Sequence, residues 1–340
     1  MDANATTMDA LRAPGAKSAG RVAVGRFAPS PSGRMHLGNI YAALLAWLSV
    51  RSQNGRMLLR IEDLDPRCAS PERARQLIDD LQWLGLTWDG DVVWQHDRLD
   101  LYREALERLD RQGLTYPCFC TRAELHAASA PHASDGTPVY TGTCRDLSAA
   151  EVAERRRLRE PAVRLRVPDA DDPSSIVRFH DRVFGEQCEN LARECGDFLV
   201  RRSDGVFAYQ LVVVVDDAEM GVSEVVRGHD LLGSTARQMY LQRLLGFDAS
   251  EYAHVPLLMA PDGHRLSKRN RDCDLGELKL VFGSPEKLLG RLAYCSGLAP
   301  DDWPRSAEAL VDLFSWDTVR DRHRDIVVDD AFFQNPTAPQ

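Results

Sequence analysis

The stretch RFAPSPSGRMHLGN, residues 26–39, decides the fold of this chain. A short apolar run at residues 22–24 precedes it and predicts a buried strand, and the apolar residues 40–50 that follow predict a buried helix. Pro29 and Pro31 exclude helix within the link, because each proline fixes φ and disfavours helical backbone in the residue before it. The stretch therefore predicts a tight strand–turn–helix.

Three residues of this stretch suit the binding of a phosphate. Gly33 and Gly38 let backbone come close to a ligand. His36 adds a side-chain donor beside a helix N-terminus, whose free N–H groups attract anions. The stretch has neither the GxxxxGK[ST] pattern of the P-loop nor the GxGxxG pattern of dinucleotide-binding folds. Taken alone, it is as readily an ordinary loop rich in glycine and proline, with one exposed histidine.

A second motif lies far downstream at residues 264–269, HRLSKR, after an apolar run and a Pro-Asp-Gly turn. By itself it could be a solvated basic turn. Together, HLGN at residues 36–39 and RLSK at residues 265–268 resemble the HIGH and KMSKS signatures of class I aminoacyl-tRNA synthetases. The sequence IEDLDP at residues 61–66 makes the chain similar to the glutamyl branch of that class.

This resemblance implies an α/β fold with a class I synthetase-type Rossmann nucleotide-binding domain. The chain's own pattern agrees, since a strand at residues 56–61 is followed by helices at residues 70–84 and 100–111, and such alternation predicts a parallel, doubly wound sheet. We also expect a buried strand at residues 211–215, and a hairpin in which residues 198–200 and 206–209 flank a Ser-Asp-Gly turn.

The chain has 340 residues, which is more than one core usually holds, so several domains are expected. We expect them in this order: a disordered tail at residues 1–20, the first half of the Rossmann domain at 21–111, an inserted acceptor-type subdomain at 112–196, the second half of the catalytic domain with the KMSKS-like loop at 197–271, and a short helical C-terminal part at 272–340.

Composition narrows the class of protein. The first twenty residues lack the apolar core of a signal peptide, and no apolar run is long enough to span a bilayer, so we expect a cytoplasmic protein without a membrane partner. The formal net charge of −9 does not favour nucleic acid, although a local basic face could still bind it. A solvated surface is the favoured interpretation of the basic run at residues 155–159.

The eight cysteines argue for free thiols or metal rather than a disulfide framework. Cys118, Cys120 and Cys144 bracket a segment with no core of its own, which predicts one structural zinc ion. Ligand chemistry alone would make His126 or His132 the fourth ligand. The resemblance instead implies Tyr140, because relatives with this insertion use Cys-x-Cys and a later Tyr-x3-Cys. Three reduced, buried cysteines without metal are the alternative.

The resemblance also implies which residues bind the substrates. The glutamate pocket would contain Arg26, Phe27, Ala28, Pro29, Ser30, Glu62, Tyr209 and Arg227. The ATP site would contain His36, Gly38, Asn39, Ser267 and Lys268, with His36 and Lys268 as the catalytic pair and Mg²⁺ accompanying ATP. Arginine suits such a pocket because it binds a carboxylate with two donors and stays charged.

Two departures from the glutamyl pattern refine this interpretation. Residues 227–232 read RGHDLL where the synthetases resemble RGEDH, and the part of the chain after Lys268 is short, so we expect no anticodon-binding domain. In both respects the chain resembles a smaller paralogous family, the glutamyl-Q tRNA(Asp) synthetases. This resemblance implies a monomer that activates L-glutamate with ATP and transfers it to queuosine at the wobble position of tRNA(Asp), with no DNA partner.

Three alternatives remain at this stage. The chain could be a compact glutamyl-tRNA synthetase that charges a tRNA 3′ end. It could be a non-catalytic paralogue that binds glutamate or a nucleotide, although His36 and Lys268 argue against that. A small-molecule ligase of the same superfamily would have no use for the insertion or for Arg26 together with Arg227.

Overall fold

The computed structural model describes residues 22–67, 69–127, 139–264, 266 and 274–334. Its first sheet is parallel, in the order β1 (Val24–Phe27), β2 (Arg56–Ile61) and β3 (Val93–Trp94). The strand predicted at residues 22–24 therefore begins two residues later, whereas the predicted strand at 56–61 is confirmed.

A second sheet continues the first. Its order is β7 (Gly185–Asn190), β6 (Ile176–Asp181), β10 (Glu251–Val255) and β9 (Glu224–Gly228), and only the β6–β7 pair is antiparallel. β9 lies beside β1, where Ser223 N donates to Val24 O over 2.9 Å and Ser223 Oγ accepts from Val24 N over 3.0 Å. The two halves of the chain thus meet at the β1–β9 edge, as the parallel α/β prediction requires.

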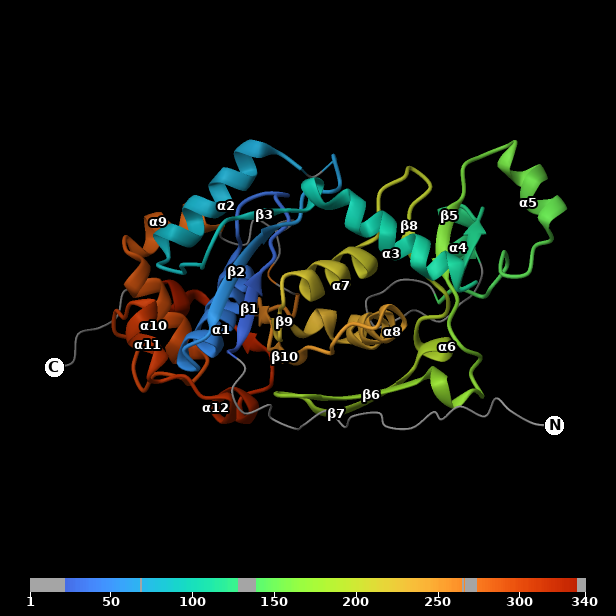
Figure 1. Cartoon of the computed structure of the whole chain (residues 1–340). Helices are drawn as coiled ribbons and strands as arrows, with labels where there is room; N and C mark the ends of the chain where they lie inside the picture. The colour runs from blue at the N-terminus through green and yellow to red at the C-terminus, as the bar shows by residue number, and fades with distance from the viewer. Residues whose placement is uncertain (1–21, 68, 128–138, 265, 267–273, 335–340) are drawn as a thin grey trace.

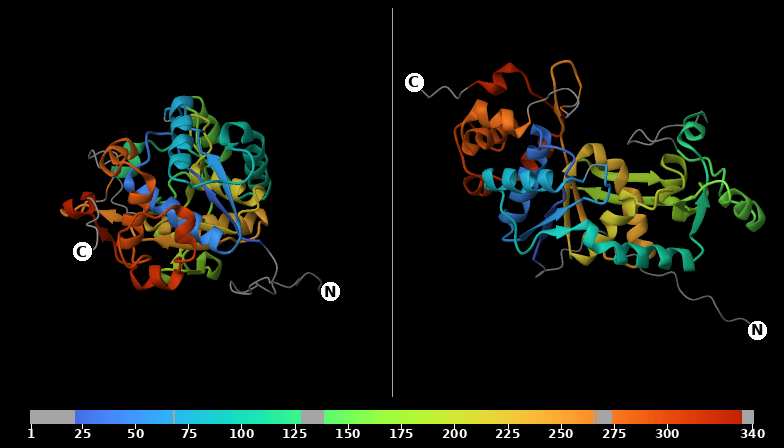
Figure 2. Two further views of the ribbon diagram at one scale, coloured as in Figure 1. Left: turned by 90° about the vertical axis from the view of Figure 1, so that its left-hand side faces the viewer. Right: turned by 90° about the horizontal axis from the view of Figure 1, so that it is seen from above.

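A third, antiparallel sheet contains β4 (Thr115–Cys118), β5 (Ala162–Leu165) and β8 (Phe198–Arg201). With α4 (Arg122–Ala127) and α5 (Ala149–Arg156) it forms one end of the molecule, and the C-terminal helices form the other (Figure 1; Figure 2, right). Strand pairing crosses the boundary expected at residue 196, because β8 follows it yet pairs with β5, while β6 precedes it and pairs with β10.

Two large clusters of buried apolar side chains stabilise the fold. The first surrounds α1 (Leu37–Ser52), which packs between the sheet and α11 (Ala307–Val311) and is buried along most of its length. This helix and α2 (Pro71–Trp83) confirm the sequence prediction, and Ser70 Oγ caps α2 by accepting from Arg73 N. The second cluster lies among α3 (Leu99–Arg111), α7 (Tyr209–Glu219) and α8 (Thr235–Leu245).

The prediction of a strand at residues 211–215 is wrong, because these residues form the middle of helix α7. Continuous apolar runs are typical of buried helices as well as buried strands, and five valines and leucines cannot tell the two apart. Burial against α3, α8 and β8 overrides the strand preference of valine. The expected hairpin survives as a tight turn at Gly205 (φ +88°), but its second strand is reduced to one bridge between Arg201 and Phe207.

The described C-terminal part is mostly helical, as expected. Its remaining elements are α9 (Leu275–Phe282), α10 (Pro285–Cys295), α12 (Trp316–Asp321) and a short parallel pair, β11 (Leu258–Met259) with β12 (Ile326–Val327). The described residues also form one short helix, α6 (Leu191–Glu194), and short 3₁₀ turns at η1 (Gln95–Arg98), η2 (Pro173–Ser175), η3 (His229–Ser234) and η5 (Asp330–Phe333). Among the described helices, none has the length and apolar character that crossing a bilayer requires.

Candidate active site

A cleft of about 870 Å³ opens where β1, β2 and β9 end. Its walls come from the residues after β1, the first turn of α1, Glu62 beyond β2, and the ends of β9 and β10. Open parallel sheets bind ligands at the carboxyl ends of their strands, where the strand order changes direction. The order β2–β1–β9–β10 places this cleft at such a point.

The cleft brings together the residues that the sequence singled out. All eight residues expected to bind glutamate line it: Arg26, Phe27, Ala28, Pro29, Ser30, Glu62, Tyr209 and Arg227. His36, Gly38 and Asn39 line it as well. Ser267 and Lys268 lie outside the described residues, but Leu266, directly before them, lines the same cleft.

The turn after β1 is tied to the end of β2. Glu62 N donates to Pro29 O over 3.0 Å, and Ser32 N donates to Ser30 O over 2.8 Å. Gly33 has φ +151°, a conformation that favours glycine over residues with a side chain. At the start of α1, His36 N donates to Asn39 Oδ1 over 3.4 Å, and His36 is buried. The local sequence thus places a helix N-terminus against the cleft.

A network of buried charges forms the floor of the cleft. Arg60 is fully buried and contacts three carboxylates: Asp217 at 2.7 Å, Glu62 at 3.2 Å and Asp216 at 3.5 Å. Arg26 Nε lies 3.5 Å from Asp217 Oδ1. Burial raises the pKa of Glu62 above its ordinary value, although Arg60 and Arg26 act in the opposite direction. Burial also acts to raise the pKa of Asp217, but the same two guanidinium groups outweigh it and hold that pKa below the ordinary value.

Arg227, at the end of β9, is held differently. Its guanidinium donates to His254 Nε2 over 3.0 Å, Gln238 Oε1 over 2.8 Å, Thr235 Oγ1 over 2.9 Å and Leu231 O over 3.3 Å. Sequence reasoning found Arg227 but missed these partners. His254 and Gln238 lie in segments whose pattern indicates only that they belong to the core, so no local feature of the sequence marks a polar role for either residue.

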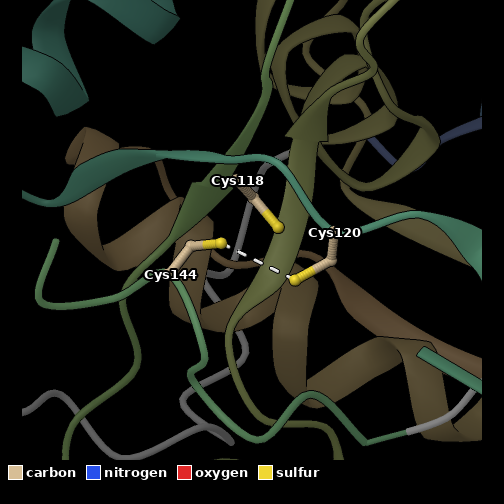
Figure 3. Close-up of side chains that lie close together, drawn as sticks. All are labelled: Cys118, Cys120 and Cys144. Carbon is tan, nitrogen blue, oxygen red and sulfur yellow. Dashed lines mark hydrogen bonds between the residues drawn. The ribbon is translucent and has the colours of Figure 1, made fainter. Parts of the chain in front are cut away.

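A second cluster lies in the β4–β5–β8 end of the molecule. The sulfur atoms of Cys118, Cys120 and Cys144 all lie within 4.8 Å of one another and point toward a common centre (Figure 3). Tyr140 Oη lies 3.6 Å from Cys118 Sγ and 3.7 Å from Cys120 Sγ, and Cys120 Sγ lies 3.6 Å from Cys144 Sγ. His132 and the side chain of His126 lie outside the described part of the structure.

These distances match the size of a tetrahedral zinc site. Four ligands at about 2.3 Å from one ion lie about 3.8 Å apart, close to the separations of this cluster. Burial acts to raise the pKa of Cys118, but Arg164, whose Nε lies 3.3 Å from Cys118 Sγ, brings the net pKa below its ordinary value. Burial raises the pKa of Cys120 to about 12. The spacing of the three sulfur atoms and the affinity of thiolates for zinc therefore fit a zinc ion, which would itself favour the deprotonated form of Cys120.

Residues 22–280 match the sequence model of the family described as tRNA synthetases class I (E and Q), catalytic domain. The chain is 48% identical to the glutamyl-Q tRNA(Asp) synthetase of Symbiobacterium thermophilum over 306 residues, which cover 85% of this chain and 91% of that protein. This chain belongs to the glutamyl-Q tRNA(Asp) synthetase family.

Other members of the glutamyl-Q tRNA(Asp) synthetase family are equally similar. The protein of Nitratidesulfovibrio vulgaris is 45% identical over 88% of this chain and 94% of its own length, and that of Nocardia farcinica is 49% identical over 81% and 85%. The solved glutamate–tRNA synthetase of Elizabethkingia anophelis superposes with a TM-score of 0.77 at 24% identity, over 92% of this chain and 69% of that one. The class I synthetase-like α/β fold is thereby confirmed.

Proposed function

We propose that this protein activates L-glutamate with ATP and transfers the glutamyl group to queuosine in tRNA(Asp). Membership of the glutamyl-Q tRNA(Asp) synthetase family makes it a ligase-type enzyme. The observation that carries the proposal within the structure is the cleft, which collects two arginines, one glutamate and a helix N-terminus within a single volume. A tRNA substrate would place the reaction in the cytoplasm.

The chemistry needs positioning more than acid–base catalysis. An α-carboxylate oxygen of glutamate attacks the α-phosphorus of ATP, the bond to the bridging oxygen breaks, and pyrophosphate leaves with the negative charge. A nucleophilic group of queuosine then attacks the carbonyl carbon of the adenylate, the bond from this carbon to the AMP oxygen breaks, AMP leaves with the negative charge, and the nucleophile releases its proton to solvent. A site that holds the reactants in line and stabilises developing negative charge can supply the rate enhancement of the first step.

The two arginines and Glu62 suit the three charges of glutamate. In our proposal, Arg227 binds the side-chain carboxylate and Glu62 accepts from the α-ammonium group. Arg26 lines the same cleft, but Asp217 already offsets its charge. Phe27, Ala28, Pro29, Ser30 and Tyr209 shape the surrounding wall.

The N-terminus of α1 suits the nucleotide. We assign the phosphates to His36, Gly38 and Asn39, since the free N–H groups of a first helical turn attract anions. We assign the departing pyrophosphate to Ser267 and Lys268, on the resemblance of RLSK to the KMSKS signature. Mg²⁺ accompanying ATP would add further positive charge at the phosphates.

We propose that Cys118, Cys120, Cys144 and Tyr140 hold one structural zinc ion. When bound, the metal would crosslink the end of β4 to the segment around residue 144, where few apolar side chains are buried. This role is separate from the chemistry of the cleft.

The test is transfer of labelled glutamate, with ATP, to three RNAs: tRNA(Asp) with queuosine, tRNA(Asp) without it, and tRNA(Glu). We expect label only on the queuosine-bearing tRNA(Asp), at a site that resists periodate oxidation of the 3′ end. Label on tRNA(Glu) at a periodate-sensitive end would instead identify a compact glutamyl-tRNA synthetase. Absence of both transfer and glutamate-dependent ATP–pyrophosphate exchange would favour a non-catalytic glutamate or nucleotide binder.

A further inference from the structure

Three adjacent strands contribute to the support of Arg227. His254 of β10 stands opposite Arg227 of β9 in the parallel register, and Asp181 is the last residue of β6 on the far side of β10. His254 and Asp181 are both fully buried. His254 Nδ1 lies 2.6 Å from Asp181 Oδ2, and His254 Nε2 lies 3.0 Å from Arg227 Nε. The three side chains thus form one line from the core of the sheet to the cleft.

The hydrogen bonds of Asp181 settle which nitrogen of His254 carries the proton. Asp181 accepts from the backbone N–H groups of Val183, Phe184 and His254 itself, so it is held as a carboxylate. His254 Nδ1–H therefore donates to Asp181, and the lone pair of Nε2 accepts from Arg227 Nε–H. Burial lowers the pKa of His254 to about 4, in agreement with a neutral ring.

This arrangement fixes Arg227 through hydrogen bonds to uncharged groups. Its hydrogen-bond partners within the described structure are the neutral His254, an amide, a hydroxyl and a backbone carbonyl. Arg26 and Arg60 differ, because both contact Asp217. Arg227 and Asp217 attract each other at longer range, which helps to lower the pKa of Asp217. A cation that hydrogen-bonds to uncharged groups still attracts a ligand carboxylate more strongly than one already in direct contact with a carboxylate.

The neutral partners are themselves held in place. Gln238 donates to Gln210 Oε1 over 2.9 Å, and Gln210 donates to Ser234 Oγ over 3.1 Å, which orients the Gln238 oxygen toward Arg227. Thr235 Oγ1 lies between Arg227 and His254, at 2.9 and 3.3 Å. Hence the position of the guanidinium depends on a connected network, and His254 is the member that fixes Nε.

We propose that His254, oriented by Asp181, is a positioning residue that aims the guanidinium of Arg227 at the side-chain carboxylate of the substrate. The inference rests on the proposed glutamate pocket. It predicts that, of the two substrates, only glutamate binds less well when His254 is changed, since Arg227 is the residue of the cleft that His254 contacts. A merely structural histidine would instead affect the binding of both substrates together.

Two substitutions test separately the contacts that the two ring nitrogens of His254 make. Asparagine places an amide near Nδ1, so His254→Asn can keep the contact with Asp181 but loses the acceptor for Arg227. Glutamine extends an oxygen toward the position of Nε2, so His254→Gln can keep that acceptor but loses the contact with Asp181. His180→Asn is a matched control, because His180 is an exposed histidine on the neighbouring strand.

The measurement is glutamate-dependent ATP–pyrophosphate exchange with tRNA present, together with thermal unfolding of each variant. We expect His254→Asn to raise the KM for glutamate roughly 10- to 100-fold, the usual effect of losing a hydrogen bond to a charged group, with the KM for ATP unchanged. His254→Gln should restore most of that loss, and His180→Asn should change neither KM. Equal glutamate KM values in the two His254 variants, or parallel losses for ATP, would overturn the inference.

The Arg227→Met variant tests whether His254 acts through Arg227. If His254 acts through Arg227, adding His254→Asn to Arg227→Met causes no further rise in the KM for glutamate. A further rise in the double variant overturns the inference while leaving the glutamate pocket intact. An unchanged KM in Arg227→Met alone overturns the pocket assignment, and the inference with it.

Discussion

Arg60 Nη1 lies 2.7 Å from Asp217 Oδ1, although the two residues are 157 positions apart in the sequence. Arg60 is the last residue but one of β2 in the first half of the parallel fold, and Asp217 belongs to α7 in the second half. The pair is buried beneath the cleft, and Arg60 also contacts Glu62, which lines it. The contact therefore links the assembly of the two halves to the shape of the candidate active site.

Removal of Arg60 should destabilise the whole protein. Arg60→Met leaves Asp216 and Asp217 buried beside fewer cations, and breaking a buried ion pair from one side costs about 3–5 kcal/mol. Urea unfolding followed by circular dichroism would measure the loss of free energy of unfolding. Arg56→Met is the matched control on the same strand, because Arg56 is exposed, and it should cost under about 0.5 kcal/mol. Similar losses in both variants would contradict the prediction.

Glu62 should matter for glutamate more than for ATP. In the proposed pocket it accepts from the α-ammonium group, and Glu62→Gln removes that negative charge while keeping the size of the side chain. We expect the KM for glutamate to rise about 10- to 100-fold and the KM for ATP to stay within about twofold. ATP–pyrophosphate exchange measures both values. Glu72→Gln, at an exposed carboxylate in the first turn of α2, is the control, and an equal KM for glutamate in both variants would exclude this role.

The sequence predicted the edge of the sheet where the cleft lies, because the strand–turn–helix at residues 26–39 and the acidic residues after β2 both mark carboxyl ends of strands. It could not place α7, since a run of valines is as apolar in a helix as in a strand. It also missed His254 and Asp181, whose partners stand on neighbouring strands that long-range pairing alone brings together. Polar support of this kind depends on register, which single-sequence periodicity does not show.

The metal cluster provides a test independent of catalysis. We expect one zinc ion per chain by elemental mass spectrometry, and Cys144→Ser should release it because one of the three converging thiols is lost. Tyr140→Phe keeps the ring but removes the oxygen near Cys118 and Cys120, so it should weaken zinc retention against a chelator. Cys188→Ser, at an exposed cysteine outside the cluster, should retain zinc fully.

The same measurement of zinc retention against a chelator identifies the fourth ligand. If His132→Ala or His126→Ala releases zinc while Tyr140→Phe holds it as tightly as the unsubstituted protein, the tyrosine assignment is wrong and a histidine completes the site. If the purified protein contains no zinc and gains none on reconstitution, the cluster consists of reduced cysteines.

Acidification should lower the free energy of unfolding through His254, and it should do so in a defined pH window. Folding lowers the pKa of His254 to about 4 from an ordinary value near 6.5. At a pH between these two values, His254 is therefore protonated in the unfolded chain but not in the folded chain. Stability from this group is thus fully present above pH 6.5 and is lost as the pH falls toward 4, by about 3 kcal/mol at most. The groups around the ring belong to this balance: Asp181 takes up no proton in this window because its pKa lies below the ordinary value, and the charge of Arg227 lowers the pKa of His254 whereas the charges of Asp181 and Asp230 raise it.

A comparison of variants isolates this effect from the other titrating groups. Asparagine does not titrate, so the stability lost by His254→Asn relative to the unsubstituted protein should be largest at pH 7 and should shrink by about 2 kcal/mol or more at pH 4.5. Urea unfolding at both pH values measures the two differences. If the stability difference between the two proteins stays constant with pH, His254 has the same pKa in the folded and unfolded chains. In that case the fold does not keep the ring neutral, and the contact proposed between the neutral ring and Arg227 loses its support.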